Sequence, residues 1–156
     1  MQDPNSSWMV LVDQRLESSL ETVDSCEERA KTEAMRLGFA EEDAYEIGYA
    51  VREAVVNAVV HGNQYSANKQ VGFGLAASGK TLRILVEDQG RGFHPDEQAD
   101  PLASENLLNQ SGRGIMIIRA FVDELRIEAA AQGGTRLVML KTVGGETPGP
   151  DAVSNS

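Results

Sequence analysis

The order of elements in the sequence predicts an α/β (α+β) two-layer sandwich in which helices cover one face of a mostly antiparallel, mixed sheet. Three observations carry this prediction: two helical patterns follow a first strand, an alternating hairpin follows them, and a second hairpin comes after one more helix. No repeat or interior linker divides the 156 residues. We therefore expect one domain over 8–142, between a flexible N-terminus (1–7) and a disordered tail (143–156).

One strand and two helices are expected in the first half of the chain. Apolar and polar residues alternate over 8–16, which predicts a strand. Ser18 and Glu21 have the spacing of a capping box, and this predicts the start of a helix that Gly38 ends. A second helix is expected over 41–61.

The second half predicts two hairpins, with a helix and a long polar segment between them. The expected strands are 69–77, 80–88, 125–129 and 135–143. The segment 94–110 is acidic and weakly periodic, which is typical of a lid or a disordered loop. The helix is expected over 112–125, with Ile115, Ile118 and Val122 on its inward face.

Composition excludes several classes of function. The formal charge is −10, from 14 basic and 24 acidic residues, which argues against binding to nucleic acid or to an anionic membrane surface. One cysteine excludes an intrachain disulfide and a cysteine-based zinc cluster. We find no spanning segment and no signal peptide, and expect a cytoplasmic protein. Residues 1–63 hold 13 acidic and 5 basic side chains, which suits either a basic protein partner or a solvated helix surface.

Glu53, Asn57 and His61 are spaced by four within a segment that is otherwise apolar almost all round. This spacing places three polar groups on one stripe of the second helix. An unpaired carboxylate or amide in an interior is costly, so the stripe needs a polar partner. A metal–phosphate ligand would serve; alternatively, Glu53 pairs with a neighbouring Arg or Lys and Asn57 caps a backbone group.

Three glycine-containing motifs follow. Asp88 ends an apolar strand, where it can accept a hydrogen bond from an exocyclic amine such as that of adenine, and Gly90 and Gly92 allow close approach to a flat ring. The alternative for this motif is an ordinary strand-to-loop turn.

Gly112, Arg113 and Gly114 directly precede a helix, where exposed N–H groups and the positive end of the dipole favour phosphate; a flexible hinge has the same composition. Gly133-Gly134 followed by Thr135 is typical of a hairpin turn, and Thr135 is a candidate supporting residue.

Taken in order, these motifs resemble the N, G1 and G2 boxes and the trailing Gly-Thr of the GHKL (Bergerat-fold) ATPases, a likeness that runs from about residue 8 to 142. The form Glu53-Ala-Val-Val-Asn57-Ala-Val-Val-His61-Gly-Asn resembles that of bacterial anti-sigma factor serine/threonine-protein kinases. The resemblance implies ATP and Mg²⁺ as cofactors, and phosphorylation of an anti-sigma factor antagonist on Ser or Thr. It also implies sequestration of a sigma factor by a homodimer.

The resemblance further implies a role for each matched residue. Asn57 would ligate Mg²⁺, and Glu53 would be the general base. Asp88 would bind the adenine amine with support from Thr135, and Gly92 would flank the base. The phosphates would be contacted, as the lid closes, by Gly112, Arg113 and Gly114. Histidine kinases look similar but usually carry Asn or His at the position of Glu53. A hydroxyl acceptor needs a base and a neutral histidine does not, so Glu53 favours serine/threonine transfer or ATP hydrolysis.

Two departures from the family pattern support another reading, a non-catalytic, nucleotide-gated protein-binding module of the same fold. The segment 109–111 lacks the basic side chain that some relatives carry before the glycines. Four carboxylates lie in the expected lid, next to a polyphosphate: Asp96, Glu97, Asp100 and Glu105.

Overall fold

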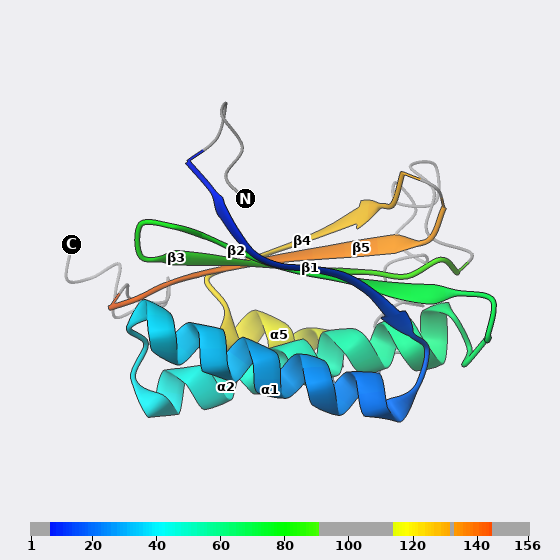
Figure 1. Ribbon diagram of the computed structural model, residues 1–156, viewed down its shortest axis with the longest axis horizontal. Coiled ribbons are helices and arrows are strands. Elements are labelled where there is room, and N and C mark those ends of the chain that lie inside the picture. The colour runs from blue at the N-terminus through cyan, green and yellow to red at the C-terminus, as the bar shows by residue number, and fades with distance from the viewer. Residues whose placement is uncertain (1–6, 91–113, 132, 145–156) are drawn as a thin grey trace.

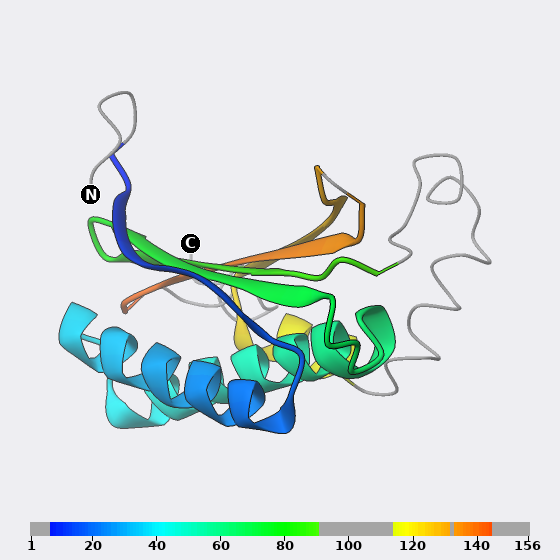
Figure 2. The ribbon, with the colours of Figure 1, turned by 45° about the vertical axis from the view of Figure 1, so that its right-hand side comes forward.

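The computed structural model describes residues 7–90, 114–131 and 133–144. Figures 1 and 2 show two layers, a twisted sheet and a layer of helices packed on one of its faces. The elements are β1 (Met9–Glu17), α1 (Leu20–Leu37), α2 (Glu41–Val56), η1 (Asn57–Gly62), β2 (Gln70–Ser78), β3 (Thr81–Glu87), α5 (Gly114–Phe121), β4 (Glu124–Ala129) and β5 (Thr135–Thr142). The predicted two-layer sandwich is confirmed. The expected lid and nearly all of the two expected tails lie outside the described residues.

The sheet has the order β1-β2-β3-β5-β4 within the described residues. Each neighbouring pair is antiparallel, so this part of the sheet is antiparallel throughout rather than mixed. The pairing of β3 with β5 sets Glu87 opposite Arg136. Because the two strands run in opposite directions, the residue that follows β3 lies beside the first residue of β5.

The first helix begins one residue later than its capping box predicts. Ser19 is the N-cap, and its hydroxyl accepts a hydrogen bond from the Thr22 amide at 3.3 Å. Ser18 has a different role: its hydroxyl donates to the Lys69 carbonyl at 2.6 Å. The predicted end is confirmed, since Gly38 has a φ of +116° and donates its N–H to the Ala34 carbonyl.

The second helix changes its geometry before it ends. Regular α-helix stops at Val56, and 57–62 form a π-helix, η1. The amide of Asn63 therefore donates to the Ala58 carbonyl, five residues back, at 2.8 Å. The apolar pattern predicted a helix over 41–61 but not this wider turn.

The third helix is shorter than predicted because the chain leaves it to join the sheet. α5 ends at Phe121, and the amide of Asp123 donates to the Leu140 carbonyl of β5 at 2.8 Å. The Asp123 carboxylate in turn accepts from the Thr142 amide at 2.8 Å. The expected inward face of this helix is confirmed, since Ile115, Ile118 and Val122 are buried.

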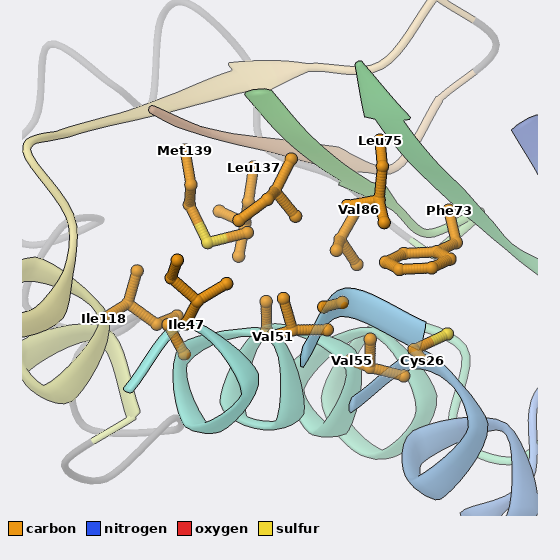
Figure 3. Packing of buried hydrophobic residues seen from close by; sticks show 14 of the residues in the cluster. Cys26, Ile47, Val51, Val55, Phe73, Leu75, Val86, Ile118, Leu137 and Met139 are labelled. Atoms are coloured by element: carbon orange, nitrogen blue, oxygen red, sulfur yellow. The ribbon is translucent and has the colours of Figure 1, made fainter. Parts of the chain in front are cut away.

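The core lies between the central helix α2 and the sheet. Figure 3 shows α2 side chains pointing toward side chains from the sheet and from α5. The α2 residues are Ile47, Val51 and Val55, and they face Phe73, Leu75, Val86, Leu137, Met139 and Ile118. The core thus fixes the rotation of α2 and the direction in which its polar residues point.

No helix in the described parts of the chain is long and apolar enough to cross a bilayer.

Replacing Ile47 with alanine should lower the free energy of unfolding by about 2–5 kcal/mol, because this side chain is fully buried between layers. Tyr45, two residues earlier and 57% exposed, is the matched control. Tyr45→Ala should cost less than about 1 kcal/mol, since it removes an exposed ring that stacks on Lys31. Chemical denaturation measures both values, and similar losses for the two variants would contradict this packing.

Candidate functional site

Two polar side chains of the central helix face the start of α5. Glu53 and Asn57 are half-buried. A Cβ placed on Gly114 would lie 3.6 Å from both amide heavy atoms of Asn57 and 3.7 Å from Glu53 Oε2. The Nδ2 atom of Asn57 is buried and has no hydrogen-bond partner within the described residues. An unsatisfied buried amide is costly, and the arrangement therefore suits a polar ligand at this position.

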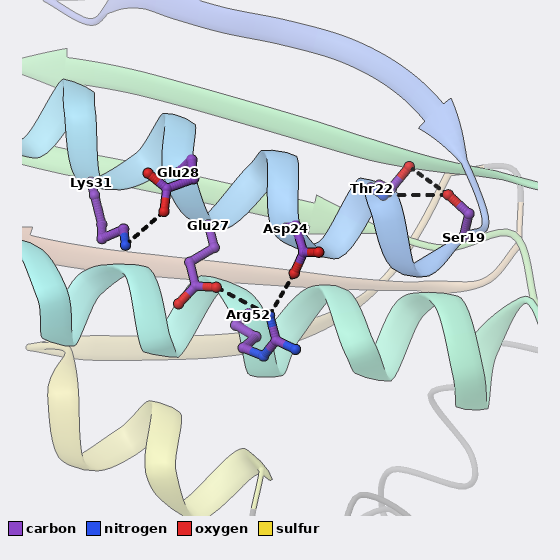
Figure 4. A network of polar contacts seen from close by, with 7 residues as sticks. All are labelled: Ser19, Thr22, Asp24, Glu27, Glu28, Lys31 and Arg52. Carbon is purple, nitrogen blue, oxygen red and sulfur yellow. Dashed lines mark hydrogen bonds and ion pairs between the residues drawn. The ribbon is translucent and has the colours of Figure 1, made fainter.

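The basic residue next to Glu53 is already engaged elsewhere. Figure 4 shows the guanidinium of Arg52 bonded to Asp24 at 2.9 Å and to Glu27 at 3.1 Å, both on α1. No ion pair joins Glu53 to a basic residue of the described chain. The described residues therefore do not support the alternative in which Glu53 is neutralised by a neighbouring Arg or Lys.

The expected polar stripe is only partly correct. His61 lies in η1 and is exposed, whereas Glu53 and Asn57 are half-buried. His61 therefore does not share the half-buried environment of the other two residues.

A second polar cluster surrounds Asp88, which is 8% exposed. Its Oδ1 atom accepts from the Gly90 amide at 2.9 Å and from the Thr135 amide at 3.1 Å. Its own amide donates to the Thr135 carbonyl at 2.9 Å. Oδ2 accepts no hydrogen bond from the described residues, so it is the oxygen left for a ligand.

Glycines from three segments enclose this carboxylate. A Cβ at Gly62, the last residue of η1, would overlap the Asp88 side chain. A Cβ at Gly134, where φ is +93°, would overlap the Asp88 carbonyl, and a Cβ at Gly90 would overlap the Gly62 carbonyl. Side chains at these three positions would therefore force the segments apart.

Burial raises the pKa of the Asp88 carboxyl. The amides of Gly90 and Thr135 and the charge of Lys69 act in the opposite direction but do not cancel the effect. Because the folded state favours the protonated form, Asp88 contributes stability below its unfolded pKa. That contribution is lost as the pH rises through the raised folded pKa.

The structure places the predicted site residues in two groups joined by η1. Glu53, Asn57 and Gly114 form the first, and Asp88, Gly90 and Thr135 form the second. Gly92, Gly112 and Arg113 lie outside the described residues.

Sequence reasoning assigned no role to Asn63, which is 1% exposed and bonds to three other segments. In the sequence it is the last residue of the motif that begins at Glu53, directly after the glycine that ends the helix.

Replacing Asp88 with asparagine should leave the ligand-free protein as stable as the wild type or more stable at pH 7. The amide oxygen can still accept from the backbone, and no charge is buried. The advantage should shrink as the pH falls and the wild-type carboxyl becomes protonated. Urea denaturation at pH 7 and pH 4 measures this, with Asp13→Asn on exposed β1 as the control. A variant that is clearly less stable at pH 7 would show that the ionised group supports the fold.

The chain is similar in sequence to known proteins. The family model for the histidine kinase-like ATPase domain matches residues 16–141. The anti-sigma F factor of Clostridium novyi (strain NT) is 36% identical over 102 residues, which cover 64% of this chain and 71% of that protein. The anti-sigma F factor of Clostridium kluyveri is 38% identical over 96 residues, covering 59% and 66%. That of Anoxybacillus flavithermus is 33% identical over 98 residues, covering 62% and 67%. The chain belongs to the histidine kinase-like ATPase domain family.

Proposed function

We propose that this protein is an anti-sigma regulatory factor that binds Mg-ATP and phosphorylates an anti-sigma factor antagonist on Ser or Thr. The observation that carries the proposal is the buried Nδ2 atom of Asn57, which has no hydrogen-bond partner within the described residues. It lies beside the Glu53 carboxylate, which forms no ion pair with a described basic residue. The names of the relatives support the regulatory part, since each is called an anti-sigma F factor. Sequestration of a sigma factor, a homodimeric state and a cytoplasmic location belong to the same proposal.

The Asp88 cluster would hold the base. Oδ1 is fully used by two backbone amides, so Oδ2 would accept the hydrogen bond from the adenine amine. The absence of side chains at Gly62, Gly90 and Gly134 brings three backbone segments close to this carboxylate. A neutral ring that donates through an amine suits this carboxylate better than a second negatively charged group.

The Asn57 cluster would hold the metal and the phosphates. Mg²⁺ prefers oxygen ligands and usually takes only one or two from the protein, the others coming from water and substrate phosphates. The described residues contain no group of three His, Cys, Asp or Glu side chains that could form an all-protein cage, which fits such a site. Asn57 would supply its Oδ1 atom to the metal, and its unpartnered Nδ2 atom would donate to a phosphate oxygen. Gly114, the first residue of α5, would donate to phosphate oxygens, and by the family resemblance so would Gly112 and Arg113, which lie outside the described residues.

Glu53 would be the general base of phosphoryl transfer. The acceptor hydroxyl would lose its proton to the Glu53 carboxylate while its oxygen bonds to the terminal phosphorus. The bond from that phosphorus to the bridging oxygen would break, and ADP would leave. Bound Mg²⁺ would neutralise charge on the phosphate oxygens. Arg52 does not neutralise the Glu53 carboxylate while its guanidinium is bonded to Asp24 and Glu27.

The distribution of charge supports a protein partner with a basic face. The three α-helices carry ten acidic and five basic residues. The five strands carry five of each. The acidic excess of these elements therefore belongs to the helical layer. Complementary charge raises the rate and selectivity of association, so we expect the partner to approach that layer.

Replacing Glu53 with alanine should leave ATP affinity within about threefold of the wild type but reduce transfer by about 10²-fold or more, because only the base is removed. The assay combines labelled ATP with a candidate antagonist and measures phosphate on that protein. Glu46→Ala, at another half-buried glutamate of α2, is the control. Undiminished transfer by Glu53→Ala would exclude this base. Binding without transfer in the wild type would favour the non-catalytic module.

Replacing Asn57 with alanine should weaken ATP binding in Mg²⁺ by about 10- to 100-fold, the effect typical of a lost metal-site contact. Binding in EDTA should change much less, because the residue then has no metal to hold. Calorimetry in both buffers measures this. Equal affinity of variant and wild type in Mg²⁺ would remove the metal assignment.

A further inference from the structure

Asn63 is the most completely bonded polar side chain between the two clusters. Its Nδ2 atom donates to the Ser18 hydroxyl at 2.9 Å and to the Gln70 carbonyl at 3.0 Å. Its Oδ1 atom accepts from the Gln89 amide at 2.7 Å. Both amide hydrogens and one carbonyl lone pair are therefore used, by partners 45, 7 and 26 residues away in the sequence.

These bonds connect the end of η1 to segments that strand pairing already brings together, since Glu17 pairs with Gln70 and Gly72 with Glu87. Ser18 lies between β1 and α1, Gln70 begins β2, and Gln89 follows Asp88 beyond the end of β3. The network closes on itself, since the Gln70 amide donates to the Gln89 side chain at 2.7 Å. The last turn of η1 is thereby tied to the segment that carries Asp88.

The backbone after Asn63 is held in an uncommon conformation. Gln64 and Tyr65 have φ values of +51° and +58°, in the left-handed region that non-glycine residues rarely adopt. Such residues persist where the surrounding contacts over-determine them, and they cluster at functional sites. The contacts that do so here begin at Asn63, whose carbonyl also accepts from the Ser66 amide.

We propose that Asn63 is a positioning residue of the nucleotide site: it holds Gln89 against the end of η1 and so aims Asp88 Oδ2 at the base. The inference rests on the proposed function, because it assigns the adenine amine to Asp88. Gly62 directly precedes Asn63 in the chain, and Gln89 directly follows Asp88. A loss of the bond from Asn63 to Gln89 therefore changes the distance between the Gly62 backbone and the Asp88 carboxylate.

A residue with a purely structural role would affect every ligand of the site alike. A positioning residue would mainly weaken the one contact whose geometry it sets, here the hydrogen bond between Asp88 and the adenine amine. The ratio of the affinities for ATP and for purine riboside triphosphate, which lacks the amine, isolates that contact. We therefore use this ratio, measured by calorimetry in Mg²⁺ at a temperature where each variant is folded.

Asn63→Ala should reduce the preference for ATP over purine riboside triphosphate by about three- to tenfold, the effect of one hydrogen bond. Ser18→Ala removes a bond of the same network without touching Gln89, and should keep the preference. Asn68→Ala, at an exposed asparagine of the same loop, should change neither affinity. Equal weakening of both nucleotides by Asn63→Ala would overturn the proposal.

Asn63→Asp provides a second test if the alanine variant does not fold. It retains the oxygen that accepts from Gln89 and loses both donor contacts, so a folded Asn63→Asp protein should keep the preference for ATP. Loss of the preference would overturn the proposal.

Failure of the proposed function gives a different result, namely a wild-type protein that binds neither nucleotide. Amide hydrogen exchange then decides the role of Asn63. Faster exchange at Gln89 and Gly90 than at Val86 in Asn63→Ala supports positioning, and unchanged exchange at these amides overturns it.

Discussion

The buried carboxylate of Asp88 is the constraint on which the rest of the site depends. An ionised group in this position is unfavourable for folding, and the chain surrounds it with backbone rather than with cations. Backbone can approach so closely only where there is no Cβ, which explains glycine at 62, 90 and 134. Each glycine comes from a different part of the fold. The carboxylate is therefore in place only when η1, the end of β3 and the start of β5 have all assembled.

The central helix packs on the sheet along its middle turns and carries residues of the candidate site nearer its end. Ile47, Val51 and Val55 fix it against the sheet, and this packing determines where Glu53 and Asn57 point. The change from α- to π-geometry then moves the end of the helix toward Asp88 without altering the earlier turns. A regular α-helix through 57–62 would rotate Gly62 away from its present contact. The π-turn thus couples a rigid core element to a site on the sheet.

Local periodicity was enough to predict the two layers, both hairpins and the polar pair Glu53–Asn57, because these depend on short-range pattern. The association of Thr135 with Asp88 was predicted only from the family resemblance. It was not enough where a distant partner decides. Ser18 and Ser19 are both good caps, and only the Lys69 carbonyl, 51 residues away, shows which of them is used elsewhere. Likewise, the contacts of Asp123 with β5 end the last helix early. No pattern in the sequence signals the π-turn.

The net negative charge of the chain has opposite effects on the two expected ligands, a protein partner and a nucleotide. A protein with a formal charge of −10 attracts a basic partner but repels a polyphosphate. Screening by salt weakens both effects at a distance, so what remains for the nucleotide is local. Backbone N–H groups at the start of α5 and a divalent cation beside Asn57 would act within a few ångströms, where the net charge matters least. Nucleotide affinity should therefore depend on a few backbone and metal contacts, whereas partner choice should depend on the acidic helical layer as a whole.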